Sequence, residues 1–390
     1  MAISADRLIL IHYHEVGLKG KNRGRFENKL MGNIARSLRG IDHGPVRRIY
    51  GRLLLELKPT TPIGVIRERL SQVFGIANFS EAVVVSANIE VIRDTAWAVV
   101  QKSSFNSFKV AARRADKTFP LNSGEINIDV GAHLQALSKA QVRMDNPDLT
   151  CHIEVSHQGV FVYTEKIPGP GGLPVGANER AVSLLSSGID SPVASYKIMK
   201  RGVQLSYIHF HSQPYTDKNS QRNTEELVRL LTRHQYKSTL YLVPFVEIQK
   251  QIMTLAPTGY RVILYRRYMF RIAEYLARAE GALAMVTGEN VGQVASQTLS
   301  NMRAIEEVTT LPILRPLAGD NKEEIVNDAR NIGTYETSIE PYEDCCTVFV
   351  PKHPETRADL EKVHEIEGSL KIDDLVERTL AQTEVKTFEF

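Results

Sequence analysis

The sequence predicts a multidomain protein that combines α/β and α+β architecture, with a doubly wound parallel sheet in its C-terminal half. Three observations lead to this fold class. The 390 residues are enough for two or three domains. A stretch rich in proline and glycine, at residues 166–178, is predicted to link two halves, because it cannot continue a helix or a central strand. Strand and helix patterns are irregularly ordered before this stretch and alternate regularly after it.

The N-terminal half is predicted to be built from α+β modules, and a second run of elements begins after Gly75. The clearest helix is at 25–39, where Phe26, Leu30, Ile34 and Leu38 recur on one face. Further helices are predicted at 91–102 and near 130–137. The predicted strands are 8–12, 52–57, 81–85, 108–112, 151–156 and 159–165.

The C-terminal half alternates apolar strand patterns with helical ones. The predicted strands are 181–185, 205–210, 239–243, 283–287 and 311–314, and one of the helices is at 260–279. This alternation is typical of a parallel sheet covered by helices on both faces. In such sheets ligands bind beyond the C-terminal ends of the strands, so we expect the site there.

Charge and cysteine content limit the possible functions. Residues 1–60 hold 12 Lys and Arg against 5 Asp and Glu, so the basic end is the candidate surface for a polyanion, or else a solvated face. Three cysteines are too few for a disulfide framework. No run of about 18 apolar residues and no signal peptide is found, so we expect a cytoplasmic protein without a membrane segment.

The most informative stretch is AVSLLSSGIDSPVASYKIMKRG, at residues 181–202. A buried strand leads into a loop of small residues, and Pro192 is expected at the first position of the next helix. The helix N-terminus presents unpaired N–H groups, which makes an anion site, and three serine hydroxyls could add donors. The alternative is an ordinary strand–turn–helix junction. The loop residues are Ser186, Ser187, Gly188, Asp190 and Ser191.

This loop is not a Walker A loop, but it is similar to the pyrophosphate-binding loop S-G-G-x-D-S of ATP pyrophosphatases. Ser187 stands where that loop has its first glycine. Asp190 is expected either to help place Mg²⁺ or to cap the helix. No set of metal-binding side chains is predicted from the sequence.

Two other segments follow strands of the predicted sheet. His209 and Phe210 end the second strand and could contact adenine, or could be a satisfied histidine and a core phenylalanine. Residues 286–299, VTGENVGQVASQTL, gather amides and small residues. A helix that starts there would place Gln293 and Gln297 on one face. The alternative is a capped helix start with a solvated face.

Adjacent cysteines, Cys345 and Cys346, lie in the segment PYEDCCTVFVPKHP. Without a C-x-x-C or a paired His/Cys spacing, a zinc site is poorly supported. Neighbouring side chains in an extended chain point in opposite directions, so one thiol is expected to be accessible and could carry a persulfide. Cys151 lies in a strand pattern and is assigned to packing.

Taken together, these motifs resemble one family along nearly the whole chain: the tRNA 4-thiouridine synthetases (tRNA sulfurtransferases, ThiI), in the form that lacks a C-terminal rhodanese domain. The resemblance implies a ferredoxin-like domain at 1–60, a THUMP RNA-binding domain at 61–166, a linker at 167–178 and a PP-loop ATP pyrophosphatase domain at 179–390. The matching segments are LKGKNRGRFENKL, FKVAARRADKTFP, PGGLPVG, LLSSGIDSPVASY, GENVGQVASQTL, RPLAGDNKEEI and EDCCTVFVPKHP.

The resemblance also implies a reaction. ATP would adenylate O4 of uridine 8 of tRNA, and a persulfide sulfur from a cysteine desulfurase would displace AMP, with Cys345 as the catalytic cysteine. It suggests a homodimer, and Cys346 is expected to form a catalytic pair with Cys345, together with Asp190 of the loop. Whether Cys346 forms a disulfide with Cys345 and whether the protein contributes to the thiazole of thiamine are left open. Together with the loop, the implied ATP site comprises Leu184, Leu185, His209, Phe210, Arg266, Gly288 and Gln297.

Contacts to the RNA backbone are expected from basic residues of the N-terminal half, although each alone could be a solvated charge. They are Lys19, Lys21, Arg23, Lys109, Arg113, Arg114 and Lys117. Two other functions remain open. One is a different PP-loop adenylating enzyme, such as an amide-forming ligase or a tRNA-cytidine modifying enzyme. The other is a non-catalytic THUMP-type RNA-binding protein.

Overall fold

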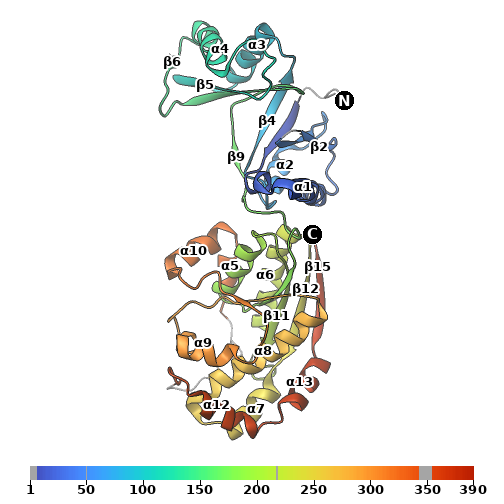
Figure 1. The fold of residues 1–390 in the computed structure, drawn as a ribbon, viewed down its shortest axis with the longest axis vertical. Helices are drawn as coiled ribbons and strands as arrows, with labels where there is room; N and C mark the ends of the chain where they lie inside the picture. The colour runs from blue at the N-terminus through green and yellow to red at the C-terminus, as the bar shows by residue number, and fades with distance from the viewer. Residues whose placement is uncertain (1–6, 50, 217, 342–353) are drawn as a thin grey trace. The chain divides into compact units, whose positions relative to one another are not determined.

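The computed structural model describes residues 7–49, 51–216, 218–341 and 354–390. The chain forms two compact units, Met1–Leu173 and Pro174–Phe390, which are called unit 1 and unit 2 and described separately (Figure 1). Among the described residues, no helix has the length and apolar composition that crossing a bilayer requires.

Unit 1 contains a sheet whose strand order is β2-β3-β1-β4-β8-β7-β5-β6, with β9 paired to β4. Its strands are β1 Arg7–His12, β2 Val46–Ile49, β3 Arg52–Glu56, β4 Asn78–Val85, β5 Ser107–Arg114, β6 Gln141–Val142, β7 Leu149–Ser156, β8 Gly159–Tyr163 and β9 Ile167–Pro168. Its α-helices are α1 Arg23–Ser37, α2 Ile63–Leu70, α3 Ile89–Val100 and α4 Ser123–Ser138.

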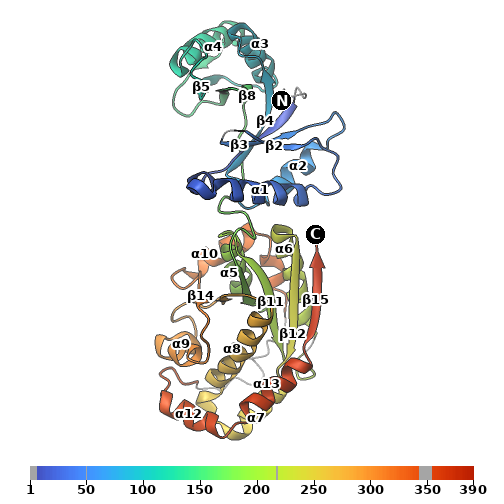
Figure 2. The same ribbon diagram turned by 45° about the vertical axis from the view of Figure 1, so that its right-hand side comes forward.

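Strand β4 joins two halves of unit 1: the half with β1, β2 and β3 on one side of it, and the half with β5, β6, β7 and β8 on the other. β4 pairs with β1 through residues 78–83 and with β8 through residues 83–85 (Figure 2). Helices α3 and α4 cover a core that includes Phe108, Val130 and Cys151. Sequence reasoning missed β2, β6 and β9 and started α4 seven residues late. Asn122 caps α4 by a reciprocal capping box with Glu125, a local signal that was overlooked.

Unit 2 is a doubly wound α/β domain with strand order β14-β13-β10-β11-β12-β15. The first five strands run parallel, and β15 is antiparallel to β12. The strands are β10 Arg180–Leu184, β11 Gln204–His211, β12 Lys237–Pro244, β13 Met285–Val286, β14 Ile313–Leu314 and β15 Glu384–Glu389.

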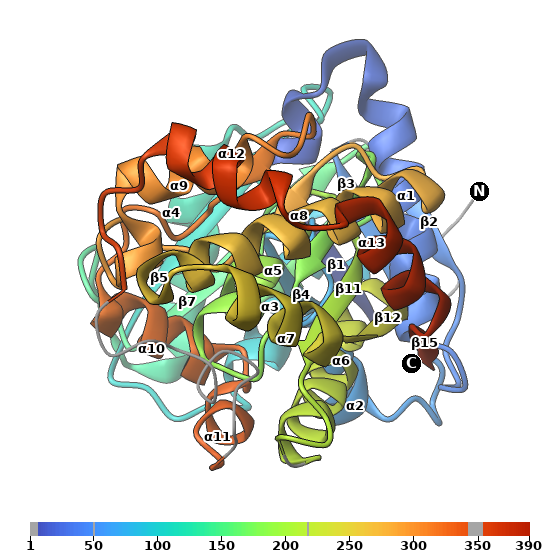
Figure 3. The same ribbon diagram turned by 90° about the horizontal axis from the view of Figure 1, so that it is seen from below.

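Helices cover both faces of this sheet, as predicted. The helices are α5 Asp190–Met199, α6 Asn219–Gln235, α7 Val246–Leu255, α8 Arg261–Ala279, α9 Leu299–Glu306, α10 Lys322–Asn331, α11 Tyr335–Ser338, α12 Leu360–Gly368 and α13 Ile372–Ala381. Figure 3 shows α12 and α13 beside α8, on the face opposite α5 and α6. The predicted strands at 283–287 and 311–314 are real but shorter, and β15 was not predicted.

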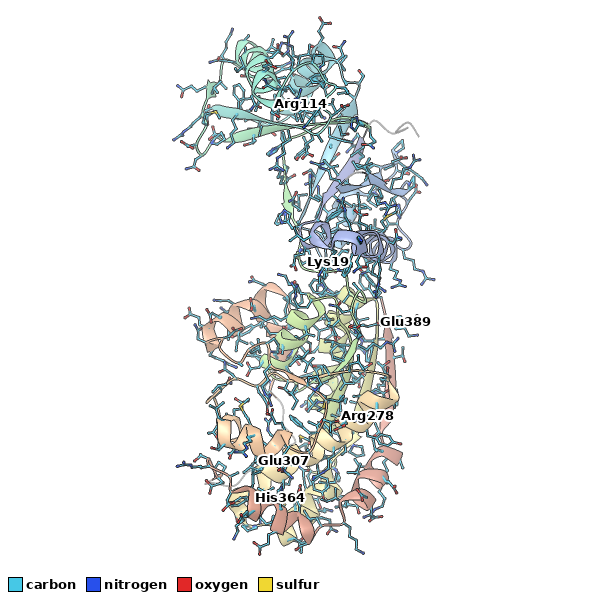
Figure 4. All side chains as sticks on the ribbon, in the orientation of Figure 1. Lys19, Arg114, Arg278, Glu307, His364 and Glu389 are labelled. Carbon is cyan, nitrogen blue, oxygen red and sulfur yellow. The ribbon has the colours of Figure 1, made fainter. Side chains whose placement is uncertain are left out.

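A buried ion cluster fastens α12 to α8. Glu367 accepts bidentate hydrogen bonds from both Arg267 and Arg271. Glu307 accepts from Arg267 and His364, and Glu307 and His364 are labelled in Figure 4. Burial raises the pKa of Glu367, but the two guanidinium groups outweigh it and lower the pKa to about 2. These two arginines of α8 therefore hold α12 in place.

Candidate functional site

A cavity of about 690 Å³ opens in unit 2, beyond the C-terminal ends of β10, β11 and β13. This is the edge at which parallel sheets bind ligands. Eleven of the twelve residues predicted to bind the nucleotide line it: Leu184, Leu185, Ser186, Gly188, Asp190, Ser191, His209, Phe210, Arg266, Gly288 and Gln297. The twelfth, Ser187, is buried next to the wall, where its hydroxyl contacts Ser220 at 3.3 Å.

The small-residue loop is held closed by its own serines. Ser191 Oγ accepts from the Ser186 amide at 2.9 Å and donates to the Ser186 carbonyl at 3.1 Å. The hydroxyls of Ser187 and Ser191 thus have partners within the protein, which differs from their expected use as free donors. The donors that this loop offers an anion are main-chain N–H groups at the start of α5.

Asp190 does not cap the helix that follows the loop. Helix α5 begins at Asp190 itself, after Ile189, so Pro192 stands third in the helix rather than first. It remains in the first turn, where its missing N–H breaks no helical hydrogen bond. The Asp190 carboxylate instead pairs with Lys322 and accepts from Gln293 Nε2 at 3.1 Å. A carboxylate and an ammonium group therefore share the mouth of the cavity.

Gly288 is where the end of β13 touches the start of α5. A Cβ added to Gly288 would lie 2.7 Å from the amide nitrogen of Ser191 and 2.9 Å from the carbonyl carbon of Asp190. Both neighbours are main-chain atoms, so no side-chain rotation could relieve the clash. Glycine is thus required by close packing, since its φ is not in the left-handed region.

His209 is a satisfied core histidine. It is 2% exposed, its Nδ1 lies 2.9 Å from the Leu185 carbonyl and its Nε2 lies 3.2 Å from Ser220 Oγ. Phe210 packs edge to face on Phe245, with ring centroids 5.4 Å apart. The imidazole is therefore engaged by the protein, and it fixes the end of β11 against the loop.

The α-helix that was considered for the stretch at residues 286–299 does not form before Leu299. Residues 288–294 form a loop, a short 3-10 turn spans Ala295–Gln297, and α9 starts only at Leu299. Gly292 has φ +78°, which ends helical geometry, and its amide donates to the Gln297 carbonyl. Gln293 and Gln297 still face the same cavity. The buried Gln297 Oε1 has no partner within the described ranges.

Cys345 and Cys346 lie outside the described residues. The residues that precede and follow their segment are described, and Ser338 and Pro354 both line the cavity. Ser338 Oγ also donates to the Gly188 carbonyl at 3.4 Å. Cys151 is fully buried in unit 1, and burial raises the pKa of its thiol to about 12, in agreement with its assignment to packing.

The basic residues predicted to bind RNA form two groups in unit 1. One group is at the start of α1, where Arg23 is bound to Glu27 and Tyr13, and the other is on and after β5. Lys19 and Arg114 are labelled in Figure 4. Lys21, Arg113 and Lys117 are exposed, whereas Lys19, Arg23, Lys109 and Arg114 are partly buried against protein groups.

Comparison with known proteins agrees with this architecture. Family models for the ThiI ferredoxin-like domain, the THUMP domain and "Thiamine biosynthesis protein (ThiI)" match residues 8–80, 86–165 and 176–372. A probable tRNA sulfurtransferase of Moorella thermoacetica is 44% identical over 98% of this chain and 97% of its own length. A probable tRNA sulfurtransferase of Thermus thermophilus is 42% identical over 98% and 94%.

A solved structure shows the same fold. It is a 4-thiouridine synthetase in complex with RNA and with bound ATP, 39% identical, with a TM-score of 0.89 over 98% of this chain and all of the other. Its similarity extends over both units, so the ferredoxin-like, THUMP and PP-loop domains predicted from the sequence are confirmed as the fold class. The chain belongs to the ThiI family of tRNA 4-thiouridine synthetases.

Proposed function

We propose that this protein is an ATP-dependent tRNA sulfurtransferase, which adenylates uridine 8 of tRNA and replaces its O4 with sulfur to make 4-thiouridine. The observation that carries the proposal is the cavity of unit 2, where the small-residue loop at residues 186–191, called the phosphate loop from here on, lies in the same lining as Ser338 and Pro354, which flank the cysteine segment. The relatives named above and the ATP-bound RNA complex support it.

In this reaction O4 of uridine attacks the α-phosphorus of ATP, and pyrophosphate leaves. The main-chain N–H groups at the start of α5 bind the departing phosphates, because they are oriented before the charge develops. Arg266 contributes a guanidinium from α8. The nucleoside part of ATP is bound by the part of the cavity at the ends of β10 and β11, which is lined by Leu184, Leu185, His209 and Phe210. Adenylation turns a poor leaving group into AMP.

Mg²⁺ would fit at Asp190. Its carboxylate lines the cavity at the phosphate loop, and Mg²⁺ is commonly held by one or two carboxylates together with substrate phosphates. The described residues form no cluster of three or more metal-binding side chains, so the phosphates would supply most ligands. When bound, the ion would neutralise charge on pyrophosphate. Lys322, which pairs with Asp190, would then be free to contact a phosphate.

Sulfur transfer is assigned to Cys345. A cysteine desulfurase would load its thiol as a persulfide, whose terminal sulfur attacks C4 and displaces AMP. A second thiol then attacks Cys345 Sγ, which breaks the S–S bond, forms a disulfide and releases 4-thiouridine. Cys346, the residue next to Cys345, could supply this thiol. Unit 1 binds the tRNA backbone through its two basic groups. We further propose a cytoplasmic homodimer, with sulfur for thiamine thiazole as a second possible product.

The test uses the full-length protein with ATP, Mg²⁺, tRNA, cysteine and a cysteine desulfurase. The wild type should release pyrophosphate only with tRNA and should produce 4-thiouridine, read by its near-ultraviolet absorbance. Cys345→Ser should keep the pyrophosphate release and lose the 4-thiouridine. Cys151→Ala, which changes a buried thiol of unit 1, should keep both. If the wild type releases no pyrophosphate with tRNA, the proposal is wrong.

A further inference from the structure

Glu289 is a buried carboxylate in the wall of the cavity, directly after Gly288. It is 2% exposed and lines the cavity. Its Oε1 accepts from Arg266 Nη1 at 2.9 Å, and its Oε2 accepts from Arg315 Nε at 2.8 Å and from Thr287 Oγ1 at 3.0 Å. Both carboxylate oxygens are thus committed, so this group is arranged to hold other side chains rather than to react.

The pairs continue outward from the cavity as a chain of alternating charges. Arg315 also pairs with Glu306 at 2.8 Å, and the Glu306 side chain is 43% exposed. The chain therefore runs from Arg266 through Glu289 and Arg315 to Glu306, with no net charge. Arg266 and Glu289 line the cavity, whereas Glu306 at the other end of the chain of charges reaches solvent.

Arg266 has a donor, its Nε, that no described residue uses. Its Nη1 binds Glu289, while its buried Nε has no hydrogen-bond partner in the part of the chain that the structure describes. A guanidinium carries five N–H donors in a rigid plane and binds phosphate oxygens well when that plane is correctly oriented. A free arginine side chain samples many rotamers, so fixing it beforehand lowers the entropy lost on binding.

We propose that Glu289 is a positioning residue for ATP, which holds the Arg266 guanidinium in the orientation that binds the nucleotide. This inference rests on the proposed function, since it takes ATP as the ligand of the cavity. Glu289 itself does not touch ATP, because a carboxylate next to the phosphates would repel them. Arg315 neutralises the second carboxylate oxygen and locks it in place.

The test compares Glu289→Gln with Glu306→Gln in the full-length protein. Both substitutions remove one carboxylate that binds Arg315, but only the first touches Arg266. ATP affinity is measured by equilibrium dialysis without tRNA or sulfur donor, and stability by the melting temperature. We expect Glu289→Gln to raise the Kd for ATP about tenfold, and Glu306→Gln to change it by less than about twofold.

A double-mutant cycle with Arg266→Ala separates positioning from general destabilisation. Once Arg266 is removed, Glu289→Gln should change the Kd for ATP by less than about twofold, even though it still lowers the melting temperature. Equal effects of Glu289→Gln in the two backgrounds, or an unchanged Kd in the wild-type background, would overturn the inference. Should Glu289→Gln fail to fold, Glu289→Asp keeps the charge, and its shorter side chain is tested by the same cycle.

These experiments distinguish a failure of the role of Glu289 from a failure of the proposed sulfurtransferase function. If the wild type binds ATP and shows the coupling but makes no 4-thiouridine, the sulfurtransferase proposal is wrong and the role of Glu289 stands. If it makes 4-thiouridine and shows no coupling, the role of Glu289 is wrong.

Discussion

Replacing Gly288 with alanine should damage the phosphate loop while adding only one methyl group. The new Cβ would stand 2.7 Å from the Ser191 amide nitrogen, so the start of α5 must move. Overpacking of this kind destabilises by about 1–3 kcal/mol. The lower entropy of the unfolded chain offsets about 0.4–1 kcal/mol of this, which leaves a net loss between about 0 and 2.6 kcal/mol, with a middle value of about 1.3 kcal/mol.

Two assays should detect this loss. A unit of roughly 200 residues shifts its melting temperature by about 2–4 °C per kcal/mol, so the middle value of about 1.3 kcal/mol predicts that Gly288→Ala melts about 3–5 °C lower. The displaced amides should also bind ATP about tenfold more weakly, which corresponds to about 1.4 kcal/mol.

The matched control is Gly319→Ala. Gly319 lies in the same unit, its φ is not left-handed, and a Cβ there would meet nothing within 4 Å. It should melt and bind ATP like the wild type. If Gly288→Ala behaves like this control, the close packing of β13 on the phosphate loop does not restrict the site.

Three further predictions concern other parts of the molecule. Burial raises the pKa of Glu154, but bonds from His12 and Tyr163 and the charge of Arg52 lower it to about 2. Unit 1 should therefore lose stability as the pH falls from about 4.5 towards 2, and Glu154→Gln should flatten this dependence in acid titrations followed by circular dichroism. Glu367→Gln should lower the unfolding free energy of unit 2 by about 3–5 kcal/mol in urea denaturation, and no change would contradict the account of the buried cluster. Arg113→Ala should weaken tRNA binding and reduce the slope of log K against log salt by about 1, whereas an unchanged slope would mean that this exposed side chain contacts no phosphate.

Sequence reasoning succeeded where the signal is local. The strand, small-residue loop and helix from residue 181 to 202 are encoded by neighbours, and their position at the C-terminal edge follows from the parallel topology. The sequence alone therefore predicts that the phosphate loop and the end of β11 share one site. The same reasoning identified Cys151 as a core residue, because it stands at an inward position of a strand.

Sequence reasoning failed where contacts between residues far apart in the sequence determine the structure. The choice between a ligand-binding and a satisfied His209 depends on Ser220 and on the Leu185 carbonyl, which no sequence pattern links to it. Glu289 stands in the polar stretch at residues 286–299, but its partners Arg266 and Arg315 lie on other elements. A helix start was considered for residues 286–299 because no sequence pattern shows that Gly292 is left-handed. β15 was missed because it is an exposed edge strand with little apolar alternation.

The shared strand β4 has a mechanical consequence for unit 1. Residue 83 takes part in both ladders, with β1 on one side and β8 on the other. A hinge between the two halves would have to break main-chain hydrogen bonds as well as the contacts of Glu154 with His12 and Arg52. We therefore expect the separation of the two basic groups to change little when unit 1 binds RNA.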